Sequence, residues 1–429
     1  MRPHFPKTTM TSISCGIDFG TSNSSVAIGT GTAVSLVPVE GEQVTIPSAL
    51  FFLRPHNDAY FGREAVNMFF ERKSGRFMRS LKRVLGTSLM TQGTAVNNRH
   101  MQFSRIIGLF LKNLKEKTDT FAGADVENVV MGRPVHFVDH NPAADDRAQE
   151  ELKAIARQVG FRHVEFQFEP IAAAFAHEAN IRGEQLAIVV DLGGGTSDFT
   201  VIKLSNRYIR KADRTADILA STGVRIGGND FDKELSLSLI MPEIGYRTTY
   251  GEKNIEVPLH PFHQLAEWSK VNFIYTPKAL MQTRQILHQS HDPSRYARLL
   301  RVLEKETGHA LLAAAERAKI VLTAHEEHQA LFDFIEDDFV VNIGRAQFEI
   351  SIQEEVRKIS AAATKCLHDA QVKPEAIDLV ILTGGSTEVP VVQAEFKRLF
   401  PQAAIADENK LSSVGLGLAY DSQNKFTSL

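Results

Sequence analysis

The sequence predicts an α/β fold in which two lobes enclose a cleft. Strand-like runs alternate with helical stretches along the chain, which is the pattern of α/β architecture. An apolar strand that ends in aspartate and enters a glycine-rich turn occurs twice, at Asp18 and at Asp191. At 429 residues the chain is also too long for one ordinary hydrophobic core. We therefore expect a duplicated lobe, with the two turns facing each other across the cleft.

The hydrophobic pattern gives the main elements in order. Strands are predicted at Ser14–Phe19, Val26–Ile28, Asn128–Met131, Leu186–Leu192, Phe199–Lys203 and Ile377–Leu382. Helices are predicted at Asn141–Val159, Ile171–Glu178, Ala310–Ala324, Gln353–Ala370 and Val391–Phe400. The two aspartates lie at the ends of the first and fourth of these strands, so each marks a strand-to-turn junction.

Composition excludes several classes of protein. The net charge of −3 gives no electrostatic footprint for nucleic acid or an anionic membrane. No apolar run is long enough to span a bilayer, and residues 1–12 resemble a flexible tail rather than a secretory signal. Cys15 and Cys366 have no metal-type or redox-type spacing, so both are predicted to be buried. These features predict a cytoplasmic protein.

The two glycine-rich turns are suited to hold phosphate groups, because glycine lets backbone N–H groups approach an anion closely. The candidate phosphate-binding residues are Gly20, Thr21, Ser22 and Asn23 in the first turn and Gly193, Gly194 and Gly195 in the second. Asp18 and Asp191 are placed to hold Mg²⁺, mainly through its waters. Either turn alone fits a plain hairpin turn equally well. The two together favour phosphate binding.

A third unit follows the strand at Leu379–Leu382. The segment Thr383-Gly384-Gly385-Ser386-Thr387 forms a polar glycine turn, and Pro390 marks the start of a helix. A strand, glycine turn and helix in this order favour anion binding at the helix start. A basic stretch that includes Arg76, Arg79 and Arg83 is interpreted as a solvated face, with the exception of Lys82.

The motifs GIDFGTSNS, VVDLGGGTSDF and LTGGSTEVP resemble the two phosphate motifs and the adenosine motif of the actin, hexokinase and DnaK superfamily. Four further segments resemble the DnaK-type heat shock protein 70 family, and in particular its short bacterial YegD-like members: Leu81–Gly86, Phe168–Ala174, Gly227–Asp232 and Glu316–Lys319. The likeness runs from about Gly16 to Ala419. It implies an actin-like ATPase fold of two lobes, each with a duplicated RNase H-like core, and a nucleotide cleft between them.

The resemblance also implies an organisation into domains. Residues 13–182 with 404–429 would form lobe I, and residues 183–403 would form lobe II. The segment at about 235–303 is longer than the family's usual one, and we interpret it as an enlarged, partner-facing tip. Its two histidine pairs are interpreted as surface histidines rather than metal ligands. After Ala419 the sequence shows no β-rich peptide-binding domain, so the resemblance carries over the ATPase but not client binding.

Site roles follow from the resemblance, residue by residue. Lys82 would position and activate the attacking water, while Glu169 and Asp198 would orient that water or the shell of the metal. Thr196 would contact the γ-phosphate. The remaining nucleotide contacts would come from Gly228, Glu316, Lys319, Thr323, Gly384, Gly385 and Ser386. Taken singly, Lys82 also fits a surface lysine and Glu169 a helix-start acid.

Two positions depart from the family. The residues that normally stack on the adenine ring are arginines, and here they are Ile320 and Glu388. Loss of a cation–π contact of about 0.5–2 kcal/mol would alter adenine affinity or base selectivity. ATP with Mg²⁺ remains the expected ligand.

The sequence therefore predicts a slow Mg-dependent ATPase that acts as a chaperone or chaperone-related switch. Client proteins or co-chaperones would be its partners, and a monomer is favoured. Three alternatives stay open: an actin-like assembly protein, a small-molecule kinase, and a nucleotide-sensing module with weak hydrolysis.

Overall fold

The structure, a computed structural model, confirms the α/β class. It describes residues 13–30, 33–71, 73–97, 99–138, 141–178, 181–209, 211, 213–268, 270–406 and 412–426. The predicted tail, residues 1–12, lies outside this part of the chain. Cys15 and Cys366 are both fully buried, as predicted. Within the described ranges no helix is long and apolar enough to cross a membrane.

The first sheet has six strands in the order β11-β10-β1-β2-β3, and β4 pairs with β2. Its strands are β1 (Ser14–Phe19), β2 (Asn23–Thr30), β3 (Ala33–Leu36), β4 (Thr45–Pro47), β10 (Asn128–Arg133) and β11 (His163–Phe168). Strands β1, β2 and β3 pair antiparallel, whereas β1, β10 and β11 pair parallel. The turn between β1 and β2 is the first predicted phosphate turn.

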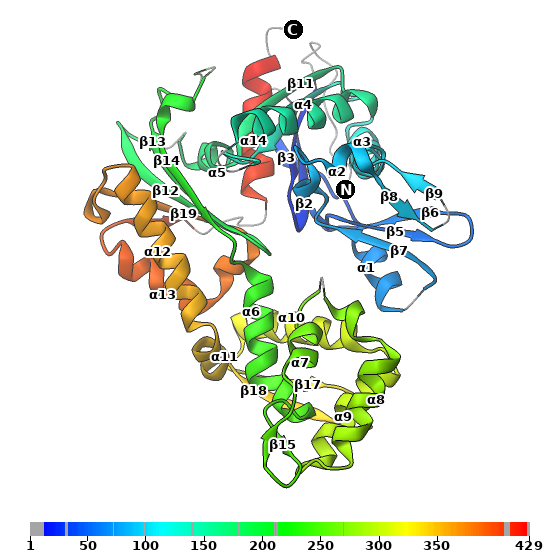
Figure 1. Ribbon diagram of the computed structural model, residues 1–429. Helices are drawn as coiled ribbons and strands as arrows, with labels where there is room; N and C mark the ends of the chain where they lie inside the picture. The colour runs from blue at the N-terminus through cyan, green and yellow to red at the C-terminus, as the bar shows by residue number, and fades with distance from the viewer. Residues whose placement is uncertain are drawn as a thin grey trace.

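The second sheet repeats this topology. Its order is β14-β13-β12-β19-β20, with strands β12 (Gln185–Leu192), β13 (Ser197–Leu204), β14 (Ile218–Val224), β19 (Leu379–Thr383) and β20 (Ala404–Ala406). Strands β12, β13 and β14 are antiparallel, and β12, β19 and β20 are parallel. The weak sequence repeat thus corresponds to a repeated order of strands, visible as two twisted sheets in the upper part of Figure 1.

Helices and small sheets complete the N-terminal part of the chain. The helices are α1 (Gly62–Phe70), α2 (Leu89–Gln92), α3 (Phe103–Ala122), α4 (Pro142–Gln158), α5 (Glu169–Glu178) and, from the end of the chain, α14 (Ser413–Phe426). The short strands are β5 (Ala49–Leu53), β6 (Asp58–Phe61), β7 (Gly75–Arg79), β8 (Thr94–Val96) and β9 (Arg99–Met101). Helix α4 begins where Asn141 caps the backbone N–H of Ala144 and Pro142 occupies the first turn.

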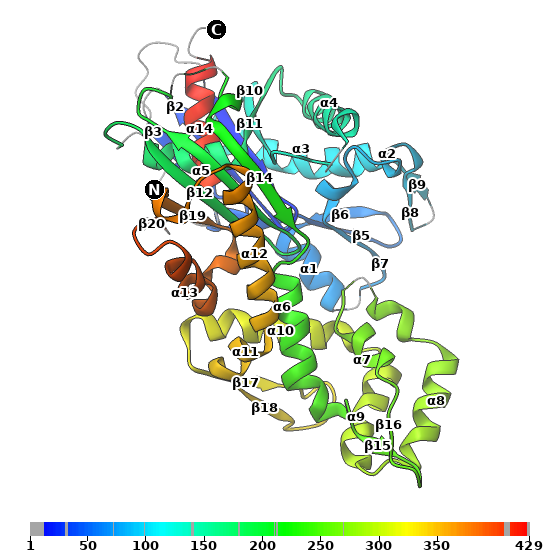
Figure 2. The same cartoon turned by 60° about the vertical axis from the view of Figure 1, so that its left-hand side comes forward.

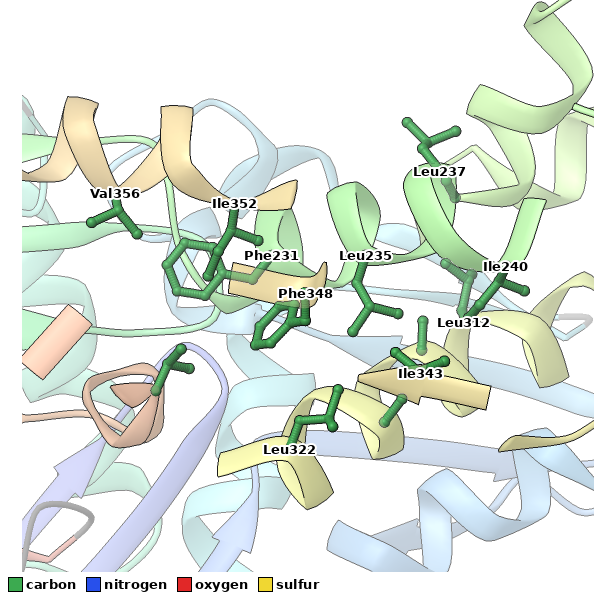
Figure 3. Close-up of a cluster of buried hydrophobic side chains, with 14 of the residues drawn as sticks. Phe231, Leu235, Leu237, Ile240, Leu312, Leu322, Ile343, Phe348, Ile352 and Val356 are labelled. Atoms are coloured by element: carbon green, nitrogen blue, oxygen red, sulfur yellow. The ribbon is translucent and has the colours of Figure 1, made fainter. Parts of the chain in front are cut away.

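A helical region lies below the second sheet in Figures 1 and 2. It contains α6 (Gly228–Leu235), α7 (His260–Leu265), α8 (Pro277–Leu287), α9 (Pro293–Glu304), α10 (Gly308–Ala324) and α11 (Arg345–Ser351), with β15 (Thr249–Tyr250), β16 (Ile255–Glu256), β17 (Glu327–Leu331) and β18 (Val340–Gly344). Helices α12 (Gln353–Asp369) and α13 (Pro390–Leu399) return the chain to the second sheet. Figure 3 shows the core of this region, where Phe231 and Leu235 of α6 lie near Phe348 of α11.

Helices α5 and α14 lie between the two sheets. Helix α14 packs on β1, β2, β10 and α5, and α5 also contacts β12, β13 and β19. Strand β12 turns Ala187 and Val189 toward these helices and Ile188 and Val190 toward the opposite core, as the two-residue period of a strand requires. The central helices therefore fill the space between the sheets and fix their relative position.

An aromatic cluster joins the N-terminal part to the helical region. The rings of Phe69 and Phe77 stack with centroids 4.4 Å apart, and Phe69 meets His309 edge-on at 4.3 Å. The single tryptophan, Trp268, lies 6.0 Å from Phe70, and the Arg79 guanidinium lies 5.3 Å from its ring. Rings from segments about 200 residues apart thus meet in one contact.

A buried ion cluster lies at the end of α5. The Arg214 guanidinium donates two hydrogen bonds to Glu178, both 2.9 Å long, and a third to Asp217. The side chains of Arg214 and Glu178 have no exposed surface. The backbone N–H of Ser205 also donates to Glu178. The geometry satisfies these charges in a place that water does not reach.

We expect Arg214→Ala to lower the free energy of unfolding by about 3–5 kcal/mol, because Glu178 would remain charged and buried without its partner. Urea denaturation followed by circular dichroism measures the change. The control is Arg284→Ala, which breaks an exposed ion pair with Glu304 and should cost less than about 1 kcal/mol. Equal losses in the two variants would contradict a stabilising role for the buried cluster.

Candidate functional site

A cavity of about 1010 Å³ opens between the two sheets and the helical region. Every site residue predicted from the sequence lies in its lining: Asp18, Gly20, Thr21, Ser22, Asn23, Lys82, Glu169, Asp191, Gly193, Gly194, Gly195, Thr196, Asp198, Gly228, Glu316, Lys319, Thr323, Gly384, Gly385 and Ser386. Sheet topology explains this convergence, because the β1–β2 and β12–β13 turns are the equivalent points of two repeated hairpins.

The first and second turns come into close contact. A Cβ on Gly194 would lie 2.5 Å from Ser22 Oγ, so only glycine allows the two turns to approach this far. Within the first turn, a Cβ on Gly20 would lie 2.1 Å from the carbonyl oxygen of Asn23. These glycines therefore serve the close packing of backbone that a phosphate cradle needs.

Neighbouring segments hold the second turn from behind. The Gly193 carbonyl accepts hydrogen bonds from Gly228 N at 3.0 Å and from Ser386 Oγ at 3.1 Å. The Gly194 carbonyl accepts one from Asn229 N at 2.7 Å. With their carbonyl oxygens engaged, these peptides offer their N–H groups as anion donors.

Lys82 and Glu169 form an ion pair in the cavity wall. Lys82 lies on the short 3-10 helix η1 (Leu81–Val84), and Glu169 is the first residue of α5, directly after β11. Their side chains are only 9% and 14% exposed. The sequence interpretation of Lys82 as a functional group rather than a surface lysine therefore has a geometric basis, because its buried ammonium contacts Glu169, another candidate site residue.

Negative charges crowd around this pair. Burial raises the pKa of Asp191 to about 8, and repulsion from Asp198 and Glu169 adds to the shift. Burial likewise raises the pKa of Asp18, with Glu169 contributing. Burial alone would lower the pKa of Lys82, but Glu169 and Asp18 outweigh it and raise that pKa. The cavity therefore favours added positive charge.

This donor set fits Mg²⁺ bound with a nucleotide. Asp18 and Asp191 end their strands beside the two glycine turns and are partly exposed to the cavity. In the described part of the chain, no group of three histidine, cysteine or acidic side chains is close enough to hold a metal ion by itself. Two carboxylates suit a hard ion that keeps several waters and takes further oxygens from phosphate.

The wall formed by α10 differs in character. Lys319 Nζ donates to the Gly228 carbonyl at 3.1 Å and to Asp232 Oδ2 at 3.0 Å, so this lysine already holds two structural partners. Ile320 is 59% exposed although its side chain is apolar. Thr323 Oγ1 donates to the Ile320 carbonyl. The α10 wall therefore presents one exposed apolar side chain, Ile320, among residues that are polar or charged.

Sequence reasoning missed several lining residues. Arg79 and Arg83, interpreted as part of a solvated face, both line the cavity; Arg83 is exposed there, and Arg79 is half-buried. The contact of Arg79 with Trp268 and of Arg83 with Gly195 depends on segments distant in sequence. Adjacency to Lys82 was the one available signal for Arg83. Asp232 lies outside the lining and pairs with Lys319, which the sequence did not indicate.

We expect Asp191→Asn to raise the free energy of unfolding of the protein without metal or nucleotide by about 1–2 kcal/mol at pH 7. This value lies at the low end of the range for removal of a buried charge, because water enters the cavity. Because the pKa of Asp191 is raised in the folded protein, the wild type loses stability as pH rises from 3.8 toward about 8. The difference in stability between Asp191→Asn and the wild type should therefore grow over that interval. Urea denaturation from pH 4 to pH 8 measures it. A variant that is less stable than wild type at pH 8 would contradict the repulsion.

Comparisons with known proteins agree with this geometry. The family model described as Hsp70 protein matches residues 14–271 and 301–423, and the unmatched residues 272–300 contain α8 and most of α9. Chaperone protein DnaK of Thermosipho melanesiensis is 26% identical over 414 residues, and that of Thermosipho africanus is 27% identical over 414 residues. Chaperone protein DnaK of Mycoplasmopsis agalactiae is 27% identical over 416 residues.

Each of these alignments covers 94% of this chain but only 57–58% of the relative. The chain thus spans a little more than half the length of the curated relatives that it matches. The repeated sheet topology and the cavity between the sheets accord with the match to the family over most of the chain. The chain therefore belongs to the Hsp70 family, as a DnaK-type member.

Proposed function

We propose that the chain binds Mg-ATP in the cavity and hydrolyses it slowly, as a chaperone or chaperone-related switch. The observation that carries this proposal is the meeting of the Lys82–Glu169 ion pair with both glycine turns and with Asp18 and Asp191 in one cavity. Membership of a family of chaperone-like ATPases supports it. Client proteins and co-chaperones are the partners that this family membership favours, and the cytoplasm is the compartment we propose.

Phosphoryl transfer asks mainly for positioning and for neutralisation of charge. The backbone N–H groups of the glycine turns and the hydroxyls of Thr21 and Ser22 would bind phosphate oxygens. Asp18 and Asp191 would hold Mg²⁺ through its waters, and the bound ion supplies charge neutralisation at the phosphates. Thr196 would contact the terminal phosphate from the second turn.

The ion pair would act on the water. Glu169 accepts a hydrogen bond from Lys82, and its carboxylate would also accept one from the attacking water and so orient it. The Lys82 ammonium would stabilise the charge that develops on the phosphoryl oxygens. Asp198 is exposed at the cavity wall, where it would assist in orienting the water shell. The water oxygen bonds to the γ-phosphorus as the bond to the bridging oxygen of ADP breaks, and the proton of the water passes to solvent.

The position of α5 would couple ATP hydrolysis at Glu169 to the contacts between the two sheets. Glu169 begins α5, and Pro170 follows it within the helix that packs between the two sheets. A change in the hydrogen bonds of Glu169 would therefore act on a helix in contact with both sheets. This arrangement supports a switch in which α5 transmits the state of the nucleotide to both sheets.

We expect Lys82→Ala to slow single-turnover hydrolysis of Mg-ATP by at least about a hundredfold, because it removes a preorganised positive charge. Rapid-quench measurement of product, with ATP binding titrated in parallel, tests this. Lys73→Ala is the control, since Lys73 is 52% exposed and pairs with Glu71 outside the cavity lining. Hydrolysis that is indifferent to Lys82 would remove it from the mechanism.

A nucleotide-sensing module with weak hydrolysis is the alternative to the ATPase, and the exposed Ile320 on the α10 wall concerns how either would hold the base. An aliphatic side chain gives the base no cation–π contact, so nucleotide would be held mainly by its phosphates. Tight ATP binding without measurable turnover in the wild-type protein would favour this candidate over the ATPase.

We expect Ile320→Arg to tighten ATP binding by about two- to thirtyfold, because a guanidinium on α10 would stack on the base. Isothermal titration calorimetry measures the affinity. Ile350→Arg is the matched control, because Ile350 is 72% exposed on α11 and lies outside the cavity lining. Unchanged affinity would show that the base does not lie against α10.

A further inference from the structure

Arg83 spans the cavity between two parts of the fold. It lies on η1, in the N-terminal part of the chain, and its Nη2 donates to the Gly195 carbonyl at 3.3 Å. Gly195 belongs to the turn of the second sheet. A Cβ on Gly195 would lie 2.7 Å from Arg83 Nη2, so the absence of a side chain at position 195 admits the guanidinium. Arg83 therefore reaches the phosphate turn itself.

The backbone that carries Arg83 is firmly held. Ser80 before η1 and Gly86 after it both adopt left-handed conformations, with φ of 58° and 74°. Two side chains of α4 clamp Gly86: its N–H donates to Glu151 Oε2 at 2.8 Å, and Arg147 Nη2 donates to its carbonyl at 3.0 Å. The position of Arg83 is thus set by the fold rather than by a loose loop.

Consecutive residues of a 3-10 helix point in different directions, because the helix has about three residues per turn. Lys82 accordingly reaches Glu169 at the start of α5, while Arg83 reaches Gly195 in the second turn. One short helix therefore presents two cations to two different walls of the cavity. Arg79, the other arginine of this basic stretch in the cavity lining, instead lies over the ring of Trp268.

The contact of Arg83 with Gly195 is a poor match for a guanidinium. It is one long hydrogen bond to a neutral carbonyl, whereas a guanidinium offers several N–H donors in a planar fork. A phosphate accepts such a fork with two charge-assisted hydrogen bonds. A triphosphate whose last phosphate lies between Lys82 and the second turn would offer Arg83 that better partner.

We propose that Arg83 distinguishes ATP from ADP by contacting the terminal phosphate. With ATP the guanidinium leaves the Gly195 carbonyl for the γ-phosphate, and with ADP it returns to Gly195. This inference rests on the proposed binding of Mg-ATP in the cavity. It adds a nucleotide-dependent link between η1 and the second turn that neither Lys82 nor the glycine turns supply.

The test compares affinities for Mg-ATP and Mg-ADP by isothermal titration calorimetry in wild type, Arg83→Ala, Arg83→Lys and Arg76→Ala. Arg76 is an exposed arginine on β7 outside the cavity lining. Arg76→Ala therefore removes the same charge as Arg83→Ala without changing the cavity. We expect Arg83→Ala to weaken ATP binding by about tenfold to a hundredfold and to change ADP binding by less than about twofold. Arg83→Lys should recover part of the loss, and Arg76→Ala should resemble wild type.

Three outcomes would overturn the inference. Equal weakening of ATP and ADP in Arg83→Ala would mean that the arginine acts through general charge or through the shape of the turn. Unchanged affinity for both would leave it a structural tether to Gly195. Wild type that binds neither nucleotide would overturn the proposed function as well, which distinguishes that failure from the first two. Thermal unfolding of each variant shows whether it is folded.

Discussion

The close packing of α14 against α5, between the two sheets, is the constraint on which the rest of the molecule depends. The two helices approach so closely that a Cβ on Gly417 would lie 1.8 Å from the Ala172 carbonyl oxygen. On its other side α14 lies against β1, where a Cβ on Gly16 would lie 2.3 Å from Ala419 N. At Gly417 the backbone of α14 meets that of α5, and at Gly16 the backbone of β1 meets that of α14. These contacts set the distance between the two sheets.

That distance decides what the cavity can be. Because β1 and β12 occupy equivalent places in their sheets, fixing the sheets brings Asp18 and Asp191 to one end of the space between them. Like charges are then held together against their mutual repulsion, and burial and Asp198 raise the pKa of Asp191 to about 8. Lys82 offsets part of this unfavourable interaction, and a divalent cation bound between the aspartates would relieve more of it.

The contacts across the cavity are few and unlike one another. At the outer side, aromatic rings of α1 and β7 meet Trp268 and His309. At the inner side, Lys82 holds α5 and Arg83 holds the second turn. The outer contact is mainly aromatic, with the Arg79 guanidinium over the Trp268 ring, whereas the inner contacts are hydrogen bonds of Lys82 and Arg83. A bound polyphosphate would therefore act first on the inner contacts of Lys82 and Arg83. The outer aromatic contact would hold the two parts together, and the inner contacts would respond to the ligand.

The sequence by itself determined the local units of this protein. The strand Ser14–Phe19, the two glycine turns and the Pro390 helix start follow from residues a few positions apart, because turn and capping preferences are local. It also identified the candidate phosphate-binding residues, since they lie within those turns, whereas Lys82, Glu169 and the residues of α10 were found through the family resemblance. Only the tertiary structure decided that Arg79 and Arg83 face the cavity, that Lys319 is paired with Asp232, and that Phe69 meets Trp268. These contacts join segments far apart along the chain, and their geometry comes from how α5 and α14 pack between the sheets, which no local pattern encodes.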